Sequence, residues 1–204
     1  MVLGLYTLLD GFTTCVLQPN LSRIVNHVQT GTLDYVLLKP IDSQFWLSAR
    51  TVSPWGLPGI LAGFGLIVWA LLNTGPGAPS GLPAAGSVLL SLALLFAALV
   101  ILYSLWFVLA ALSIWFVKVW NATEVLRYIL VAGRYPVSAY PPALRLLFTF
   151  VLPVAFLTTV PAEALLGRGS AIWALGSLLA AGLCLVASRL LWRYAQRSYT
   201  SASS

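Results

Sequence analysis

The fold is decided by one uninterrupted apolar stretch, residues Thr51–Val117: TVSPWGLPGILAGFGLIVWALLNTGPGAPSGLPAAGSVLLSLALLFAALVILYSLWFVLAALSIWFV. Its 67 residues include no Asp, Glu, Lys, Arg or His. A helix needs roughly 20 apolar residues to cross a bilayer, so the stretch is long enough for two spans and a connector. Lipid offers the backbone no hydrogen-bond partners, and we therefore expect these spans to be helices.

The composition of the whole chain excludes a soluble domain. Of its 204 residues, 60% are hydrophobic and 8% are charged, against about 25% charged in an ordinary soluble domain. A soluble fold of this size could not cover its surface with so few polar residues. The net charge of +6 comes from scattered Lys and Arg, no two of them adjacent. Such scattered charges at the flanks of apolar segments are typical of topology determinants and argue against binding of nucleic acid.

We predict an all-α, multi-span transmembrane helical bundle in a single domain, 1–204. It has five apolar segments: 1–17, 54–72, 84–117, 146–162 and 171–188. The first is short for a span. The third would be roughly 50 Å long as a straight helix, at 1.5 Å per residue, so we expect one long span that tilts or extends beyond the lipid.

The basic residues predict how the connectors face. Ten of the eleven Lys and Arg lie in three regions: 18–53, 118–145 and the tail 189–204. The connectors 73–83 and 165–170 contain only Arg168. By the positive-inside rule the three basic regions and the carboxyl terminus are cytoplasmic, and the amino terminus is outside. An outer amino terminus before a short first segment indicates that an upstream helix is missing.

Candidate catalytic and metal-binding residues are few. His27 is the only histidine and lies in a predicted cytoplasmic connector, whereas Cys15 and Cys184 lie in apolar segments and Ser80 faces the other side. No candidate nucleophile is therefore placed beside His27 to form a catalytic triad. A lone histidine cannot build a zinc site either. No glycine-rich loop ends in Gly-Lys-Ser/Thr, so ATP-driven work would belong to another chain. We therefore predict no catalytic, cofactor-binding or metal-ligating residue.

The segment PNLSRIVNHVQTG, residues 19–31, is amphipathic. Its apolar residues recur at helical spacing on one face, and its polar residues point away from them: Leu21, Ile24, Val25 and Val28 against Ser22, Arg23, Asn26, His27 and Gln29. Asn20 is placed to cap the helix, and Gly31 to end it in a left-handed turn. We predict a short helix in the cytoplasmic interface. It either rests on lipid as a linker or presents its polar face to a partner.

The segment AGRYPVSAYPPALR, residues 132–145, cannot form a continuous helix because of its prolines. Its tyrosines suit the headgroup level of a membrane. We interpret it as an interfacial elbow on the cytoplasmic side, with these central residues: Arg134, Tyr135, Pro136 and Tyr140.

The fourth apolar segment is interrupted by Pro153 and Pro161, with Glu163 near its outer end. Proline-broken helices often line pathways or re-enter from one face of the membrane. Glu163 either belongs to such a pathway, reaches the outer headgroups, or pairs with Arg168. The GxxxG at Gly59–Gly63 permits close helix contact.

Three blocks of sequence resemble the permease subunits of type 2 ABC transporters, in particular a bacterial branch. They are NLSRIVNHVQTGTLDYVLLKPIDSQF, AGRYPVSAY and FVLPVAFLTTVPAEALLGR. Members of that family have six spans and both ends in the cytoplasm. The resemblance implies that this chain is similar to a member without its first helix and part of its second.

The resemblance also implies a role and partners. The coupling region that docks on the ATPase corresponds to these residues: Asn20, Arg23, Asn26, His27, Asp34 and Lys39. The expected partners are a cytoplasmic ABC ATPase, which would bind the ATP and Mg, and a second permease subunit. The expected location is a bacterial cytoplasmic membrane, and the expected activity is export. The alternative is a non-transporting membrane scaffold or assembly protein, which would tolerate charge reversal at Arg23.

Overall fold

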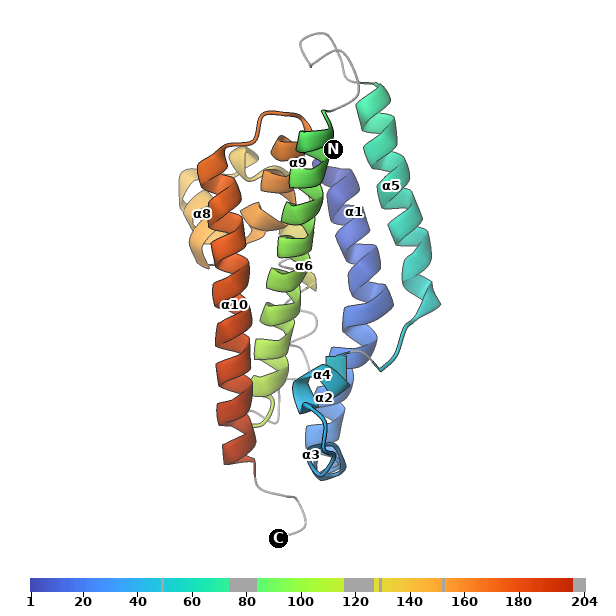
Figure 1. The fold of residues 1–204 in the computed structure, drawn as a ribbon, viewed down its shortest axis with the longest axis vertical. Coiled ribbons are helices and arrows are strands. Elements are labelled where there is room, and N and C mark those ends of the chain that lie inside the picture. The colour runs from blue at the N-terminus through green and yellow to red at the C-terminus, as the bar shows by residue number, and fades with distance from the viewer. Residues whose placement is uncertain (49, 74–83, 116–126, 129, 152, 200–204) are drawn as a thin grey trace.

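The computed structural model describes residues 1–48, 50–73, 84–115, 127–128, 130–151 and 153–199, and in these ranges every regular element is a helix. Three helices are long and apolar enough to cross a membrane: Pro54–Leu72, α6 (Ala85–Leu112) and α10 (Ala171–Ser198). The first comprises a 3₁₀ turn followed by α5 (Leu57–Leu72). Such helices cover the two predicted spans 54–72 and 171–188, and α6 is the single long helix expected in the third segment (Figure 1). Lys118 and most of the 73–83 connector lie outside the described ranges.

The amino-terminal helix is longer than predicted. α1 (Val2–Phe12) runs through a π-helical turn, Thr13–Leu17, into α2 (Gln18–Gln29) without leaving helical backbone geometry. The predicted short helix at 19–31 is thus the end of a continuous helix. Asn20 consequently does not cap a helix start. Pro19 lies at the boundary between the apolar first segment and the amphipathic second, but the π-helical turn before it leaves room for its ring, so the helix continues.

α1 packs against α5 through glycine. A Cβ atom on Gly63 would lie 2.5 Å from the backbone nitrogen of Leu8, and one on Gly11 would lie 2.5 Å from that of Ile60. The two backbones therefore touch where only glycine leaves room. The close contact expected from Gly59–Gly63 is present, and its partner is α1.

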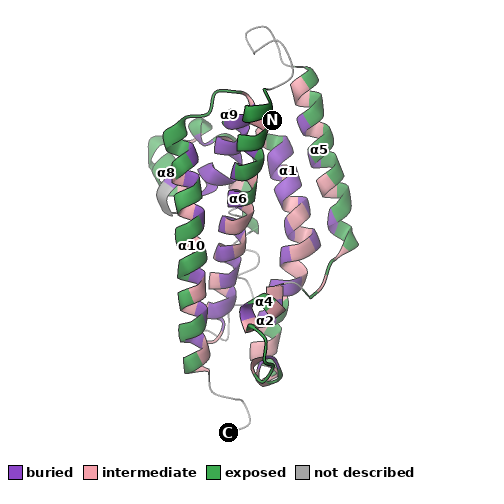
Figure 2. Cartoon of the chain, viewed as in Figure 1, coloured by how far each residue is buried: buried purple, intermediate pink, exposed green. Residues whose placement is uncertain are grey.

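α6 lies at the centre of the bundle, and α10 packs side by side with it (Figure 1). Trp192 of α10 is 1% exposed and meets Phe107 of α6 edge to face, with ring centroids 5.1 Å apart. Buried residues gather along α6, whereas the outer faces of α5 and α10 are exposed (Figure 2). Those exposed faces are apolar, as a surface in contact with lipid requires.

The predicted span 146–162 is not one helix. This part of the chain forms two helical stretches: α8 (Pro142–Leu146) continues into π-helical Leu147–Val151, and π-helical Ala155–Thr159 continues into α9 (Val160–Leu165). The chain leaves the helix at Pro153, as predicted. Pro161, in contrast, lies in the first turn of α9 and interrupts nothing. The π-helical turn before it leaves room for a ring that an α-helix would push against the preceding turn.

These pieces lie at the end of the bundle where α6 and α10 begin. Ser91, near the start of α6, donates a hydrogen bond to the carbonyl of Pro161 (3.0 Å), and Phe156 lies 6.1 Å from Trp173 between ring centroids. The elbow follows them, because Thr158 donates to the carbonyl of Gly133 (2.8 Å). This end is opposite to α2 and to the end of α10 (Figure 1).

The prediction that the elbow faces the same side as α2 is therefore wrong. That prediction assumed that residues 146–162 cross the membrane as a fourth span, which would put the elbow and the connector 165–170 on opposite sides. Pro153 divides the segment into two helical stretches, 142–151 and 154–165, each shorter than the roughly 20 residues that a span needs.

Candidate functional site

The region predicted to couple to an ATPase is built from α2, α3 (Asp34–Leu37) and α4 (Ser43–Ser48) at one end of the bundle (Figure 1). The chain leaves α2 through Gly31, two residues after Gln29, in the predicted left-handed conformation with φ of 68°. The N–H of Thr32 donates to the carbonyl of His27 (3.0 Å), and the N–H of Gly31 donates to that of Val28 (3.4 Å). This pair of bonds is a Schellman motif, which stops the helix and redirects the chain toward α3.

Asn20 holds the region together from inside. It is 2% exposed, and its amide donates to the carbonyls of Val16 and Thr51, both at 2.7 Å. Its carbonyl oxygen accepts from the backbone N–H groups of Arg50 (3.1 Å) and Thr51 (2.8 Å). Asn20 therefore lies beneath the surface on which it was predicted, and joins α2 to the chain that enters α5.

The other predicted docking residues lie nearer the surface. Arg23, Asn26 and Lys39 are exposed, whereas His27 and Asp34 are half-buried. Arg23 donates to the hydroxyl of Thr51 (2.8 Å). The ammonium of Lys39 lies 4.0 Å from the ring centroid of Trp46, a cation–π arrangement that keeps the side chain against α4.

His27 is bound to the turn that follows its helix. Its Nδ1 lies 2.7 Å from the hydroxyl of Thr32. Burial lowers the pKa of the His27 ring below its usual value, and the positive charges of Arg50 and Arg23 lower it further. The neutral form of His27 is thus favoured.

The chain around α3 exposes apolar residues that sequence reasoning did not select. Tyr35 and Leu38 are 72% and 81% exposed, and Ile41 and Phe45 are exposed as well. The exposed Lys39 lies between Leu38 and Ile41 in the sequence. The sequence signal was present in LDYVLLKPIDSQF, but at this spacing apolar residues are equally expected to be buried.

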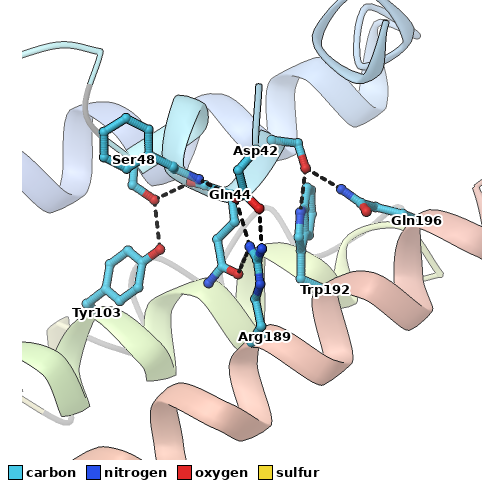
Figure 3. Close-up of polar contacts among 9 residues, drawn as sticks. Asp42, Gln44, Ser48, Tyr103, Arg189, Trp192 and Gln196 are labelled. Carbon is cyan, nitrogen blue, oxygen red and sulfur yellow. Dashed lines mark hydrogen bonds and ion pairs between the residues drawn. The ribbon is translucent and has the colours of Figure 1, made fainter. Parts of the chain in front are cut away.

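A polar network connects α4 to α10 and α6 (Figure 3). The guanidinium of Arg189 on α10 forms an ion pair with the carboxylate of Asp42, with Nη1 donating to Oδ1 at 2.7 Å and Nη2 donating to Oδ2. The same Nη1 donates to the side-chain oxygen of Gln44 (3.1 Å). The guanidinium thus binds the start of α4 in a two-pronged, charge-assisted contact.

Serines extend the network on both sides of the ion pair. The Ser43 hydroxyl accepts from the indole N–H of Trp192 (3.0 Å) and from the amide of Gln196. The Ser48 hydroxyl lies 2.8 Å from the phenol oxygen of Tyr103 on α6. α4 is therefore attached to α10 and α6 at both of its ends.

Asp42 also begins α4. Its Oδ1 accepts from the N–H of Phe45 (3.0 Å), and its carbonyl accepts from Trp46 (2.9 Å), as in an N-capping residue. The Arg189 guanidinium, aided by this cap, holds the pKa of the Asp42 carboxyl well below its usual range. Asp42 is therefore a fixed negative charge at any physiological pH.

The elbow and the proline-broken segment form a second unit, far from α4. The phenol of Tyr140 donates to the carbonyl of Ala132 (2.8 Å), and the Arg134 guanidinium lies 5.2 Å from the ring centroid of Tyr6 on α1. Tyr135 and Pro136 are exposed beside them, and Glu163 is exposed on α9. The structure thus does not bring Arg134 or Glu163 together with the coupling residues.

Comparison with known proteins shows to which family the chain belongs. Residues 1–203 match the family described as ABC-2 family transporter protein. The chain belongs to the ABC-2 transporter family. No curated protein and no solved structure matches it.

Membership gives the helical bundle a general role. An ABC-2 protein with several helices able to cross a membrane is the integral membrane component of a transporter. Within the described ranges, no group of three or more His, Cys, Asp or Glu is arranged to hold a metal ion. The groups that the structure does assemble, Asn20 with Thr51 and Asp42 with Arg189, connect helices to one another.

Proposed function

We propose that this chain is the catalytically inert permease subunit of an ATP-driven ABC exporter in a bacterial cytoplasmic membrane, coupled to a separate ATPase. The observation that carries the proposal is the attachment of α4 to α10 and α6 through Asp42, Ser43 and Ser48. A segment outside the membrane that docks on a motor must transmit movement to the spans. A direct connection to these two helices is what such transmission requires.

The surface of this region suits a protein partner. α2 presents the exposed polar residues Arg23 and Asn26, and the chain at α3 presents Tyr35, Leu38 and Lys39. Large exposed apolar groups beside charges are typical of interaction surfaces in proteins. Membership of the ABC-2 family implies an ATPase partner in general, and we infer that it contacts this surface. ATP and Mg would be bound by that partner.

We infer further that two permease subunits enclose the path. Arg127 and Arg134 are exposed beside Tyr6, near the start of α1. Ionisable residues on a membrane-spanning bundle face protein or water rather than lipid. A second subunit, identical or related, would cover them or enclose water against them. The two arrangements of such a pair would be biased by nucleotide binding in the ATPase.

The test is reconstitution with the ATPase encoded nearest to this gene. We expect the two proteins to co-purify and the hydrolysis rate to change on assembly. Arg23→Glu should abolish that change while the thermal unfolding midpoint stays constant. Arg197→Glu, an exposed charge reversal at the same end of the molecule, is the matched control and should leave coupling intact. A chain that binds no ATPase, or that tolerates Arg23→Glu, would instead be a membrane scaffold.

A further inference from the structure

A groove of about 600 Å³ lies between α4 and the second half of α10, bordered on one side by α6. Its walls are mainly apolar and include Phe45, Leu185, Val186 and Leu190. Val186 and Leu190 are 56% and 60% exposed, so the groove opens away from the helical core. A volume of this size lies within the range of small-molecule sites.

The position of the groove along α10 relates it to the membrane. α10 begins at Ala171, so Val186 lies roughly 22 Å and Arg189 roughly 27 Å along the helix at 1.5 Å per residue. The hydrocarbon core of a bilayer is about 30 Å thick. The apolar walls therefore face the acyl chains of the leaflet on the α2–α4 side, and Arg189 lies near the level of its headgroups.

The polar rim of the groove holds the Asp42–Arg189 ion pair, so the surplus positive charge near the groove comes from Arg193 of α10. Arg189 lines the groove beside Ser48 and Tyr103, which bond to each other. Within the described part of the chain, its guanidinium donates three hydrogen bonds, to Asp42 and Gln44. A guanidinium has five N–H donors. Two remain for an acceptor such as a phosphate oxygen, and Arg193, exposed one turn further along α10, adds positive charge.

We propose that this groove binds one anionic phospholipid, with an acyl chain along Leu185, Val186 and Leu190 and the phosphate on Arg189. The apolar walls continue the lipid-facing surface of α10, and charge complementarity selects an anionic headgroup. The site is independent of any ATPase. Because Arg189 also holds α4 through Asp42, the lipid contacts the same side chain that connects the coupling region to α10.

Native mass spectrometry of the full chain in a neutral detergent tests the proposal. Phosphatidylglycerol should bind with a saturable stoichiometry of one per chain, and phosphatidylcholine about fivefold more weakly, as expected for about 1 kcal/mol per basic residue facing anionic lipid. Val186→Trp should fill the groove and remove this binding. Leu179→Trp, on the same lipid-exposed face two turns away, should leave it unchanged.

Two variants of the ion pair separate phosphate binding from structural support. Both Arg189→Gln and Asp42→Asn break the pair, but only the first removes the phosphate donor. Phosphatidylglycerol binding should be lost in Arg189→Gln and retained or strengthened in Asp42→Asn. Equal loss in both variants would assign the effect to disruption of α4 and overturn the site.

Three further results would overturn the proposal. The first is binding of both lipids in numbers that rise with concentration without saturating, which indicates general lipid coverage only. The second is normal binding to Val186→Trp. The third is conversion of a dimer to a monomer by Val186→Trp without an effect on lipid, which would make a second copy of the chain the occupant.

Discussion

Asp42 and Arg189 lie 147 residues apart and form an ion pair that attaches the start of α4 to α10. Each side chain is only partly covered, with 41% of Asp42 and 34% of Arg189 exposed. A pair so accessible to water contributes little to stability, about 0.2–1 kcal/mol. Its importance lies in geometry, because it fixes α4 relative to a membrane-spanning helix.

Asp42→Asn should therefore lower the thermal unfolding midpoint by at most about 4 °C while reducing the stimulation of ATP hydrolysis several-fold. Scanning fluorimetry on the chain's tryptophans gives the first quantity, and hydrolysis in the reconstituted complex gives the second. The double variant Asp42→Arg with Arg189→Asp restores opposite charges but not the cap on α4. It should recover coupling only in part. A large loss of stability in Asp42→Asn without a loss of coupling would contradict this role.

Asn20→Ala should be among the most damaging single changes outside the spans. It leaves the part-buried N–H groups of Arg50 and Thr51 without their acceptor. An unsatisfied group costs up to about 1–3 kcal/mol when it is fully buried. Thermal unfolding in detergent measures the loss. Asn26→Ala, on an exposed face of the same helix, should change stability by no more than about 0.5 kcal/mol. Equal effects of the two variants would mean that the Asn20 bonds do not hold α2 to α5.

His27 should make stability depend on pH just below neutrality. Its pKa is lowered in the folded chain, whereas in the unfolded chain it is about 6.5. As the pH falls through that value the unfolded state takes up a proton that the folded state resists, so stability decreases. His27 is the only histidine. Unfolding midpoints measured from pH 8 to pH 5.5 should fall in the native chain and fall less in His27→Gln. Parallel curves for the two proteins would refute the assignment.

Gly63→Ala should separate α1 from α5. The added methyl group would lie 2.5 Å from the backbone nitrogen of Leu8, and because backbone cannot rotate aside, the helices must move apart at a cost of about 1–3 kcal/mol. Gly65→Ala is the control, since a Cβ there has no neighbour within 4 Å. The midpoint of thermal unfolding should drop for Gly63→Ala alone. A drop in both would point to helix bending rather than to interhelical contact.

Local features explain what could be read in advance around the coupling region. Gly31 ends α2 because glycine adopts positive φ without strain, and Gly59–Gly63 allows close approach because it has no side chains. The Asp42 cap was legible in IDSQF, since an aspartate three residues before Phe45 fits the start of a helix. The ion pair of Asp42 with Arg189 could not be predicted in this way. Nothing in the sequence around Arg189 distinguishes it from the other basic residues at the predicted cytoplasmic ends of the spans.

The sequence by itself determined that the chain spans a membrane as helices, since Thr51–Val117 has no charge and lipid leaves its backbone no other solution. The family is likewise a property of the sequence, because residues 1–203 match the ABC-2 family. Only the tertiary structure decided that Asn20 is buried, that Asp42 meets Arg189, and that Arg134 lies at the opposite end from α2. Periodicity and charge are properties of neighbouring residues. Which distant residues make contact depends on how the helices pack. The position of a proline-broken segment depends on which helices it packs against.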